Sequence, residues 1–357
     1  MSLAFADILG QITDPYLHTD LISGNLVTEA SAENGAALVK LRYPYPAQSA
    51  FAQTAAEIKT KLAAAGFSRA EVSMELRIFP HIVQGGVERL PQVKNVIVVG
   101  SAKGGVGKST TAVNLALALA AEGAQVGILD ADVHGPSLPT MLGTNERPQG
   151  GEKGGIEPLR VQGLQVMSIG FMVPAEQPTI WRGPMASRAF TQLMQETRWD
   201  SLDYLVVDLP PGTGDIQLTI AQKTPVTGAV VVTTPQEIAV ADAQKGIAMF
   251  GKVSIPVLGV VENMGLHCCP HCGHESHIFG AGGARRLCEK FGVPLLGELP
   301  LDLEIRAAID AGRPTVAAAP HSDMARRYRQ MAAQVGAAIA QKPRDRSSAF
   351  PKIVATQ

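Results

Sequence analysis

The sequence predicts an α/β fold in which a mostly parallel sheet carries helices on both faces, preceded by a small α+β domain. From about residue 93 onward, the expected strands are near-continuous runs of Val, Ile and Leu, which is typical of strands buried on both faces. These runs alternate with helical stretches, as parallel strands joined by crossover helices do. The 357 residues are 46% hydrophobic and 18% charged, so the chain has the composition of a globular protein with a sizeable core.

The first 82 residues differ in texture from the rest and predict the small α+β domain. Their strand candidates are short, and the last one largely alternates apolar with polar side chains, as a half-buried strand does. Their longest helical stretch is rich in Ala and ends at Gly66. The expected elements are a helix over 2–12, strands over 21–27 and 37–43, a helix over 49–65 and a strand over 72–79.

Residues 83–92 predict a linker, because they contain Gly85, Gly86 and Pro91. The second domain is expected over residues 93–341. Residues 342–357 are polar and include two prolines, which indicates a flexible tail. The strands expected in the second domain are 96–100, 126–129, 166–169, 204–207, 229–233, 257–261 and 294–296, and the helices are 110–122, 184–197, 237–250 and 284–291.

The charge balance and the apolar runs exclude several classes of partner. The chain has 31 basic and 32 acidic side chains, and a net charge of −1 gives no electrostatic reason to expect nucleic acid. The N-terminal residues carry no basic flank of the kind that opens a secretory signal. No apolar run approaches the roughly 18 residues that a membrane span needs. We therefore expect a cytoplasmic protein that does not reside in a membrane.

A glycine-rich segment follows the first expected strand of the second domain and precedes a helix, which is the setting of a phosphate-binding loop. Its glycines let backbone N–H groups point at phosphate oxygens, and the positive end of the following helix adds to that field. We expect Lys108 to contact the β- and γ-phosphates of a nucleotide and the Ser109 hydroxyl to bind Mg²⁺. Ala102 stands where the general phosphate-loop pattern has its first glycine. The segment instead matches a variant of that pattern that has a second lysine, here Lys103. The matching residues are Lys103, Gly104, Gly105, Val106, Gly107, Lys108, Ser109 and Thr110.

Three aspartates follow later strands at the point where each strand ends. Asp130 and Asp132 close the strand at 126–129, and Asp208 closes the strand at 204–207. In open α/β sheets, ligands bind at the carboxyl ends of the strands. Carboxylates in that position suit contacts to Mg²⁺. The segment from Pro210 to Gly214 is rigid at one end and rich in glycine at the other, as a nucleotide-sensing switch would be.

All four cysteines lie close together near the C-terminal third of the chain. Cys268, Cys269, Cys272 and Cys288 fall within 21 positions, and none precedes them. Such clustering in a reducing compartment indicates metal chemistry. The turn Cys269-Pro270-His271-Cys272 can present two thiolates to one metal. Cys288 lies within an expected helix, and we interpret it as a core residue.

Two cysteines make only half of a metal site, and three completions are open. The same two residues of a second subunit could complete a cluster at a two-fold axis. His274 and His277 could complete a zinc site within one chain. Cys268 or Cys288 could be a further ligand, and a redox dithiol at Cys269 and Cys272 also stays open.

Taken together, these motifs resemble those of the Mrp/ApbC iron–sulfur cluster carriers, which belong to the variant P-loop ATPases alongside the MinD and ParA branches. The resemblance covers about residues 93–340. Residues 1–82 are similar to the small Fe–S assembly domain often fused ahead of such carriers, with its Asp14-Pro15 hallmark. The matching motifs are Lys103–Thr110, Asp130–Ser137, Asp208–Asp215, Thr234–Glu237, Glu262–Met264 and Cys269–Cys272.

This resemblance implies a role for each residue of the nucleotide site. It places Lys103 across a dimer, on the nucleotide of the other subunit. It gives Asp132 the task of positioning the attacking water, and it places Asn263 at the adenine. The remaining nucleotide residues hold phosphates and Mg²⁺, namely Lys108, Ser109, Thr110, Asp130 and Asp208.

The resemblance further implies a homodimer in which Cys269 and Cys272 of both chains hold one [4Fe–4S] cluster. ATP hydrolysis, which is slow in the family, accompanies the transfer of that cluster from donors to apo-proteins. The implied cofactors are ATP, Mg²⁺ and the [4Fe–4S] cluster.

Two other functions compete with the carrier. The first is a MinD/ParA-like positioning ATPase, for which a basic amphipathic helix over residues 324–339 would bind lipid. We favour the alternative for that segment, which is a terminal helix packed on the sheet. The second is an ATPase scaffold that zinc stabilises and that has no cluster role.

Overall fold

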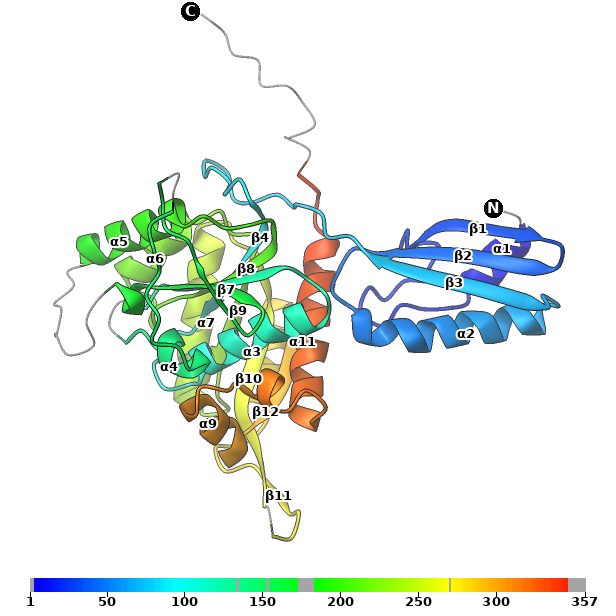
Figure 1. Cartoon of the computed structure of the whole chain (residues 1–357). Coiled ribbons are helices and arrows are strands. Elements are labelled where there is room, and N and C mark those ends of the chain that lie inside the picture. The colour runs from blue at the N-terminus through cyan, green and yellow to red at the C-terminus, as the bar shows by residue number, and fades with distance from the viewer. Residues whose placement is uncertain (1–2, 133–134, 152–153, 173–182, 270, 346–357) are drawn as a thin grey trace, which may run out of the picture.

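The computed structural model describes residues 3–132, 135–151, 154–172, 183–269 and 271–345, and the chain forms two lobes (Figure 1). The larger lobe is built on one nine-stranded sheet with helices on both faces, and the smaller lobe on a separate three-stranded sheet. Both parts of the predicted fold class are therefore confirmed. Among the described residues, no helix combines the length and the hydrophobicity that crossing a bilayer requires.

The sheet of the larger lobe is parallel except at its two ends. Its order is β11-β10-β9-β4-β8-β5-β7-β6, with β12 paired to the far side of β10. Among the described strands of this sheet, only β6 and β11 pair antiparallel with their neighbours. The central strands β4, β5, β8 and β9 are buried almost throughout, which explains their unbroken apolar runs. The bounds are β4 Val93–Gly100, β5 Val126–Asp130, β6 Leu159–Val161, β7 Leu164–Ser168, β8 Leu202–Asp208, β9 Gly228–Thr233, β10 Val257–Cys268, β11 Glu275–Ser276 and β12 Leu295–Pro300.

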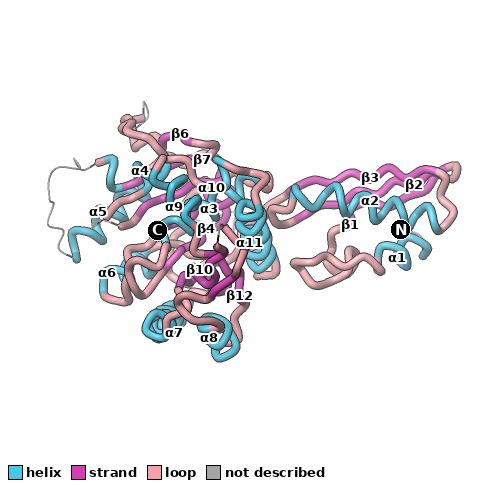
Figure 2. Tube along the Cα trace, turned by 90° about the horizontal axis from the view of Figure 1, so that it is seen from below, coloured by secondary structure: helices cyan, strands magenta, loops and turns pink. Residues whose placement is uncertain are grey.

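Helices cover the sheet from both sides (Figure 2). Helices α3 and α11 pack against each other on one face, and α7 and α8 cover β9 and β10 from the other. The apolar positions of α11 are buried, including Tyr328, Met331, Val335 and Ile339, so its packed interpretation is confirmed. The bounds are α3 Lys108–Ala121, α4 Leu138–Leu142, η2 Ile169–Phe171, α5 Gly183–Glu196, α6 Asp215–Lys223, α7 Glu237–Lys252, α8 Gly283–Phe291, α9 Leu303–Asp310, α10 Thr315–Ala318 and α11 Asp323–Ala340.

The strands of the smaller lobe lie in the order β1-β2-β3. The strand predicted over residues 21–27 is wrong. The segment 21–25 is a turn, because the Asp20 carboxylate accepts the N–H groups of Ile22 and Ser23, at 2.9 and 2.8 Å. The strand follows that turn instead, and its mostly exposed face explains its polar sequence. The bounds are α1 Leu3–Leu9, β1 Val27–Glu33, β2 Ala36–Tyr43, η1 Gln48–Ala50, α2 Phe51–Ala64 and β3 Arg69–Leu76.

The start of the expected tail is fixed in place next to the linker. Ile82 N–H donates to the Pro343 carbonyl at 3.1 Å, and Asp345 N–H donates to the Pro80 carbonyl at 2.9 Å. The Arg344 guanidinium lies 3.8 Å from the centre of the Phe79 ring, and Arg89 pairs with Asp345. Residues 342–345 are therefore not the loose chain that composition predicts, and 346–357 lie outside the described residues.

The two lobes share an interface centred on α11 and on the end of α3. Ala333 and Ala337 of α11 belong to the core of the small lobe. The buried Glu122 carboxylate, just after α3, accepts Ser49 N–H of the small lobe at 2.8 Å and lies 3.8 Å from Arg329 of α11. The small lobe is thus packed on the two helices that cover one face of the main sheet.

Candidate functional site

The phosphate loop joins the carboxyl end of β4 to the first turn of α3, as the sequence predicts. Gly105 and Gly107 both have φ of +81°, a left-handed conformation that glycine adopts without a Cβ penalty. Gly107 is the residue that precedes α3, so the loop delivers its last peptide groups to the helix N-terminus. Val106 is buried, whereas Lys103, Gly104 and Gly105 are exposed. Lys103 therefore lies on the solvent-facing part of the loop.

Lys108 and Asp208 form a buried ion pair at the centre of the site. The Lys108 ammonium contacts Asp208 Oδ1 and lies 3.1 Å from the Ser109 hydroxyl. Lys108 is 6% exposed and Asp208 is 0% exposed. Burial raises the pKa of Asp208, while the Lys108 charge and hydrogen bonds from Lys108 and Ser109 oppose that shift. A nucleotide phosphate would compete for Lys108 and free this carboxylate.

The residues around Asp208 fit a magnesium ion. Asp208 Oδ2 is buried and has no hydrogen-bond partner among the described residues, and such a carboxylate oxygen is costly unless a cation or water satisfies it. The Ser109 hydroxyl lies beside the same carboxylate. Hydroxyl and carboxylate oxygens, together with nucleotide phosphates, are the ligands that Mg²⁺ prefers.

Asp130 and Asp132 lie together in the loop after β5 but differ in their surroundings. Asp130 is fully buried, and its carboxylate accepts N–H groups from Asp132 and Ser137 at 3.0 Å and the Ser168 hydroxyl at 3.1 Å. Burial and the charge of Asp208 raise its pKa to about 7. Asp132 is only half-buried. Asp130 therefore holds the loop, and Asp132 is the more accessible of the two; Val133 and His134 lie outside the described residues.

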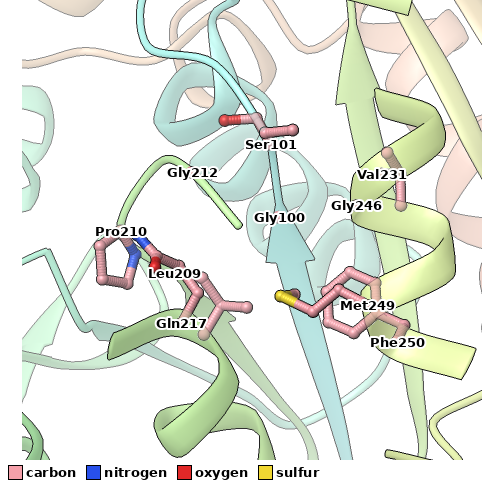
Figure 3. A pocket seen from close by; sticks show the side chains of 11 residues that line it. Gly100, Ser101, Leu209, Pro210, Gly212, Gln217, Val231, Gly246, Met249 and Phe250 are labelled. Atoms are coloured by element: carbon pink, nitrogen blue, oxygen red, sulfur yellow. The ribbon is translucent and has the colours of Figure 1, made fainter. Parts of the chain in front are cut away.

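The segment after β8 is hydrogen-bonded to the start of the phosphate loop. Gly212 N–H donates to the Ser101 carbonyl at 2.8 Å, and the Gln217 side chain donates to the Pro211 carbonyl. A small pocket between this segment, the end of β4 and α7 is lined by Leu209, Gln217 and Phe250 (Figure 3). The expected switch thus contacts the loop, and the pocket behind it, about 10 Å³ in volume, has room for no more than about one water molecule. Gln217 could not be predicted from the sequence, since a glutamine in the first turn of a helix carries no functional signal.

Asn263 lies against the phosphate loop. Its Nδ2 donates to the Val106 carbonyl at 2.9 Å, and a Cβ on Gly107 would collide with the same amide. The expected adenine contact would have to be made from this position. Glu262, next to it, is 3% exposed and accepts Ala284 N–H at the start of α8 at 2.8 Å.

The two expected cluster ligands lie at the tip of a hairpin formed by the end of β10 and by β11, which projects from the body of the large lobe (Figure 1). Cys269 is half-buried and Cys272 is exposed. The Cys269 carbonyl accepts Gly273 N–H, and its N–H donates to the His274 carbonyl, both at 2.9 Å. N–H groups of Cys272 and His271, followed by the Cys272 side chain, lower the pKa of Cys269. The turn thus favours a thiolate, although Pro270 lies outside the described residues.

The other candidate ligands do not gather around this pair. Within the described ranges, no three His, Cys, Asp or Glu side chains are grouped to hold a metal ion. His277 Nδ1 instead donates to the Gly265 carbonyl at 2.7 Å. Cys288 is buried in α8, as expected for a core residue, and burial raises its pKa to about 11. Cys268 is exposed, with its sulfur 3.6 Å from the Gly273 carbonyl.

Comparison with known proteins places the chain among iron–sulfur carriers. The family model described as NUBPL iron-transfer P-loop NTPase matches residues 92–336, and the model of an iron–sulfur cluster assembly protein matches residues 6–74. An iron–sulfur cluster carrier protein of Escherichia coli K12 is 59% identical over 69% of this chain and 67% of its own length. The carrier of Haemophilus influenzae is 48% identical over 92% of this chain and 89% of its own.

Solved structures agree on the fold. A nucleotide-binding protein of Archaeoglobus fulgidus in complex with ADP is 39% identical, has a TM-score of 0.56, and matches 63% of this chain and 89% of its own. The cell-division ATPase MinD of Pyrococcus furiosus has a TM-score of 0.52 at 22% identity, over 68% of this chain and 98% of its own. The second likeness concerns the fold alone.

Proposed function

This chain belongs to the NUBPL iron-transfer P-loop NTPase family, and we propose that it is a homodimeric carrier that binds and hydrolyses ATP and transfers a [4Fe–4S] cluster to apo-proteins. The observation that carries this proposal is the pairing of two sites on one strand. β10 passes the phosphate loop at Asn263 and ends at the cysteine hairpin. A positioning ATPase has no use for the second site.

In the nucleotide site, residues of the chain would position ATP and supply charge that stabilises its phosphates. The loop N–H groups and Lys108 bind the phosphates, and Ser109, with Asp130 and Asp208, would hold Mg²⁺, which supplies charge neutralisation when bound. Asp132 would orient the attacking water. Lys103, which is exposed, would contact the nucleotide of a second chain. The buried Lys108–Asp208 pair keeps the lysine in place before ATP arrives.

In the cysteine site, each chain offers two thiolates, and a [4Fe–4S] cluster takes four. We propose that Cys269 and Cys272 of two chains share one cluster at the two-fold axis. The exposure of the hairpin supports this arrangement, because both the cluster and an acceptor need access to it. The lack of a third grouped ligand in the described part of the chain is consistent with it.

Anaerobic reconstitution with iron and sulfide tests the proposal. The reconstituted chain should show the absorption of a [4Fe–4S] cluster and restore activity to the apo form of an enzyme that needs such a cluster. A chain that stays colourless, or that holds its cluster but cannot restore the acceptor, would contradict the carrier function. Stoichiometric zinc without iron or sulfide in anaerobically purified protein would support the scaffold instead.

A further inference from the structure

Strand β10 contains an irregular segment, Asn263–Gly265, between the nucleotide site and the cysteine hairpin. The pairing of β10 with β9 ends at Glu262. Its pairing with β12 also breaks at Glu262 and resumes at Leu266, so that four steps along β10 match two steps along β12. We call this segment the β10 bulge. Bulges of this kind re-aim side chains and are common next to functional sites.

Met264, at the centre of the β10 bulge, has a strained backbone. Its φ is +58°, in the left-handed region, although it is not a glycine and lies inside a strand. A residue with a Cβ adopts this conformation only where the surrounding structure imposes it. The Met264 side chain is half-buried, and its Cε lies 4.0 Å from the place that a Cβ on Gly107 would occupy. The strained residue thus borders the phosphate loop.

The β10 bulge is hydrogen-bonded to both sites. On one side, Asn263 Nδ2 donates to the Val106 carbonyl of the phosphate loop at 2.9 Å. On the other side, His277, which follows β11 of the cysteine hairpin, donates to the Gly265 carbonyl at 2.7 Å. Only Met264 separates these two anchor residues. The backbone of Met264 is therefore the segment of β10 that joins the loop contact to the hairpin contact.

We propose that the β10 bulge couples the nucleotide site to the cysteine pair, with Met264 as its positioning residue. When phosphates reorient the loop carbonyl at Val106, Asn263 loses its partner and Met264 can relax to an extended conformation. A relaxed strand would advance the residues after Gly265 relative to β12, which moves the hairpin that carries Cys269. Resting on the proposed carrier function, this gives ATP a direct means to change access to the cluster site.

The test uses the metal-free full chain, so that its outcome is separate from cluster loading. The rate at which iodoacetamide alkylates Cys269 is measured by peptide mass, with and without saturating Mg²⁺ and a non-hydrolysable ATP analogue. In the unmodified chain, the nucleotide should change this rate by about 5-fold or more, the lower end of typical coupling between sites. A nucleotide that binds without changing the rate overturns the proposal, even where reconstitution yields a working carrier.

Three variants test whether the backbone of Met264 causes the effect of the nucleotide on the alkylation rate. Met264→Gly removes the Cβ penalty and keeps the bulge in its present form, so the nucleotide effect should fall to about 1-fold while binding persists. Met264→Ala keeps the Cβ and should retain the effect. Ser254→Gly relieves the same kind of backbone strain, at φ of +56°, before the opposite end of β10, and should also retain it. An undiminished effect in Met264→Gly, or an equal loss in Ser254→Gly, overturns the assignment.

Discussion

The nucleotide site and the cysteine hairpin lie at the same end of the sheet but are built in opposite ways. At the centre of the nucleotide site, Lys108 and Asp208 are buried and paired with each other. The hairpin is exposed to solvent, and the two thiols proposed as cluster ligands lie at its tip. In the proposed carrier, the first site takes ATP largely from the residues of one chain, whereas the second needs the thiols of another chain. The comparison is thus between a site whose buried charges pair within one chain and a site that is open to solvent.

The largest effect is expected from substitutions in the cysteine hairpin, which should leave the nucleotide site intact. Either Cys269→Ala or Cys272→Ala should abolish the cluster after reconstitution, because one thiolate per chain leaves two positions of the cluster without a ligand. ATP binding should remain, since neither side chain touches the loop. The absorption spectrum and the iron content measure the first effect, and nucleotide titration measures the second.

Cys288→Ala is the matched control, because this thiol is buried in α8 and its raised pKa disfavours the thiolate. It should keep the full iron content and lose only the packing of one small side chain. Iron lost from Cys288→Ala and kept in Cys272→Ala would reverse our assignment of the ligands.

The next largest effect is expected from a substitution in the nucleotide site, which should leave the cysteine hairpin intact. Lys108→Ala should lower ATP turnover by about 100-fold or more, because it removes the buried charge that stabilises the phosphates. It also leaves Asp208 buried without its cation. Phosphate release under steady-state conditions measures the loss. Reconstituted iron content should be unchanged, and turnover equal to that of the unmodified chain would remove Lys108 from the site.

A smaller effect is expected at Lys103. This residue belongs to the expected nucleotide site but is exposed, as the cysteine hairpin is. Lys103→Ala should lower turnover by about 10-fold, which equals ~1.4 kcal/mol of transition-state stabilisation. The thermal stability of the variant should not change, as is usual when an exposed side chain is replaced. In the unmodified chain, turnover per chain should rise with protein concentration, and that rise should weaken in the variant. A loss of thermal stability would point to a role within one chain.

The smallest effect concerns Cys268, which lies beside Cys269 but is exposed. Cys268→Ala should leave the reconstituted iron content and the free energy of unfolding unchanged, the latter within ~0.5 kcal/mol. Iron analysis and urea unfolding measure the two quantities. A clear loss of iron in this variant would make Cys268 a third ligand and would contradict a cluster held by two thiolates from each chain.

Local motifs made most of the candidate site predictable. Strand, loop and helix around Lys108 follow from contiguous residues, and so does the Cys269–Cys272 turn. The expected strands in the buried sheet were found within a few residues, except that β10 extends to Cys268, because continuous Val and Ile runs leave little choice.

Features that depend on distant contacts could not be predicted. β1 is polar because most of it faces solvent, so its sequence does not distinguish it from a loop. Residues 342–345 are fixed by Pro80 and Ile82, which are about 260 positions away in the chain. The left-handed backbone of Met264 has no signal in its side chain, since the surrounding strands and the phosphate loop impose it.

Native mass measurement of the anaerobically reconstituted chain tests the central claim most directly. Since each chain supplies two thiolates and the cluster takes four, the expected species is two chains that hold one [4Fe–4S] cluster, or two iron atoms per chain. Since the shared cluster joins the two chains in this account, the species should separate into single chains without iron when a chelator removes the cluster. A single chain that carries a complete cluster of four irons would contradict the shared site.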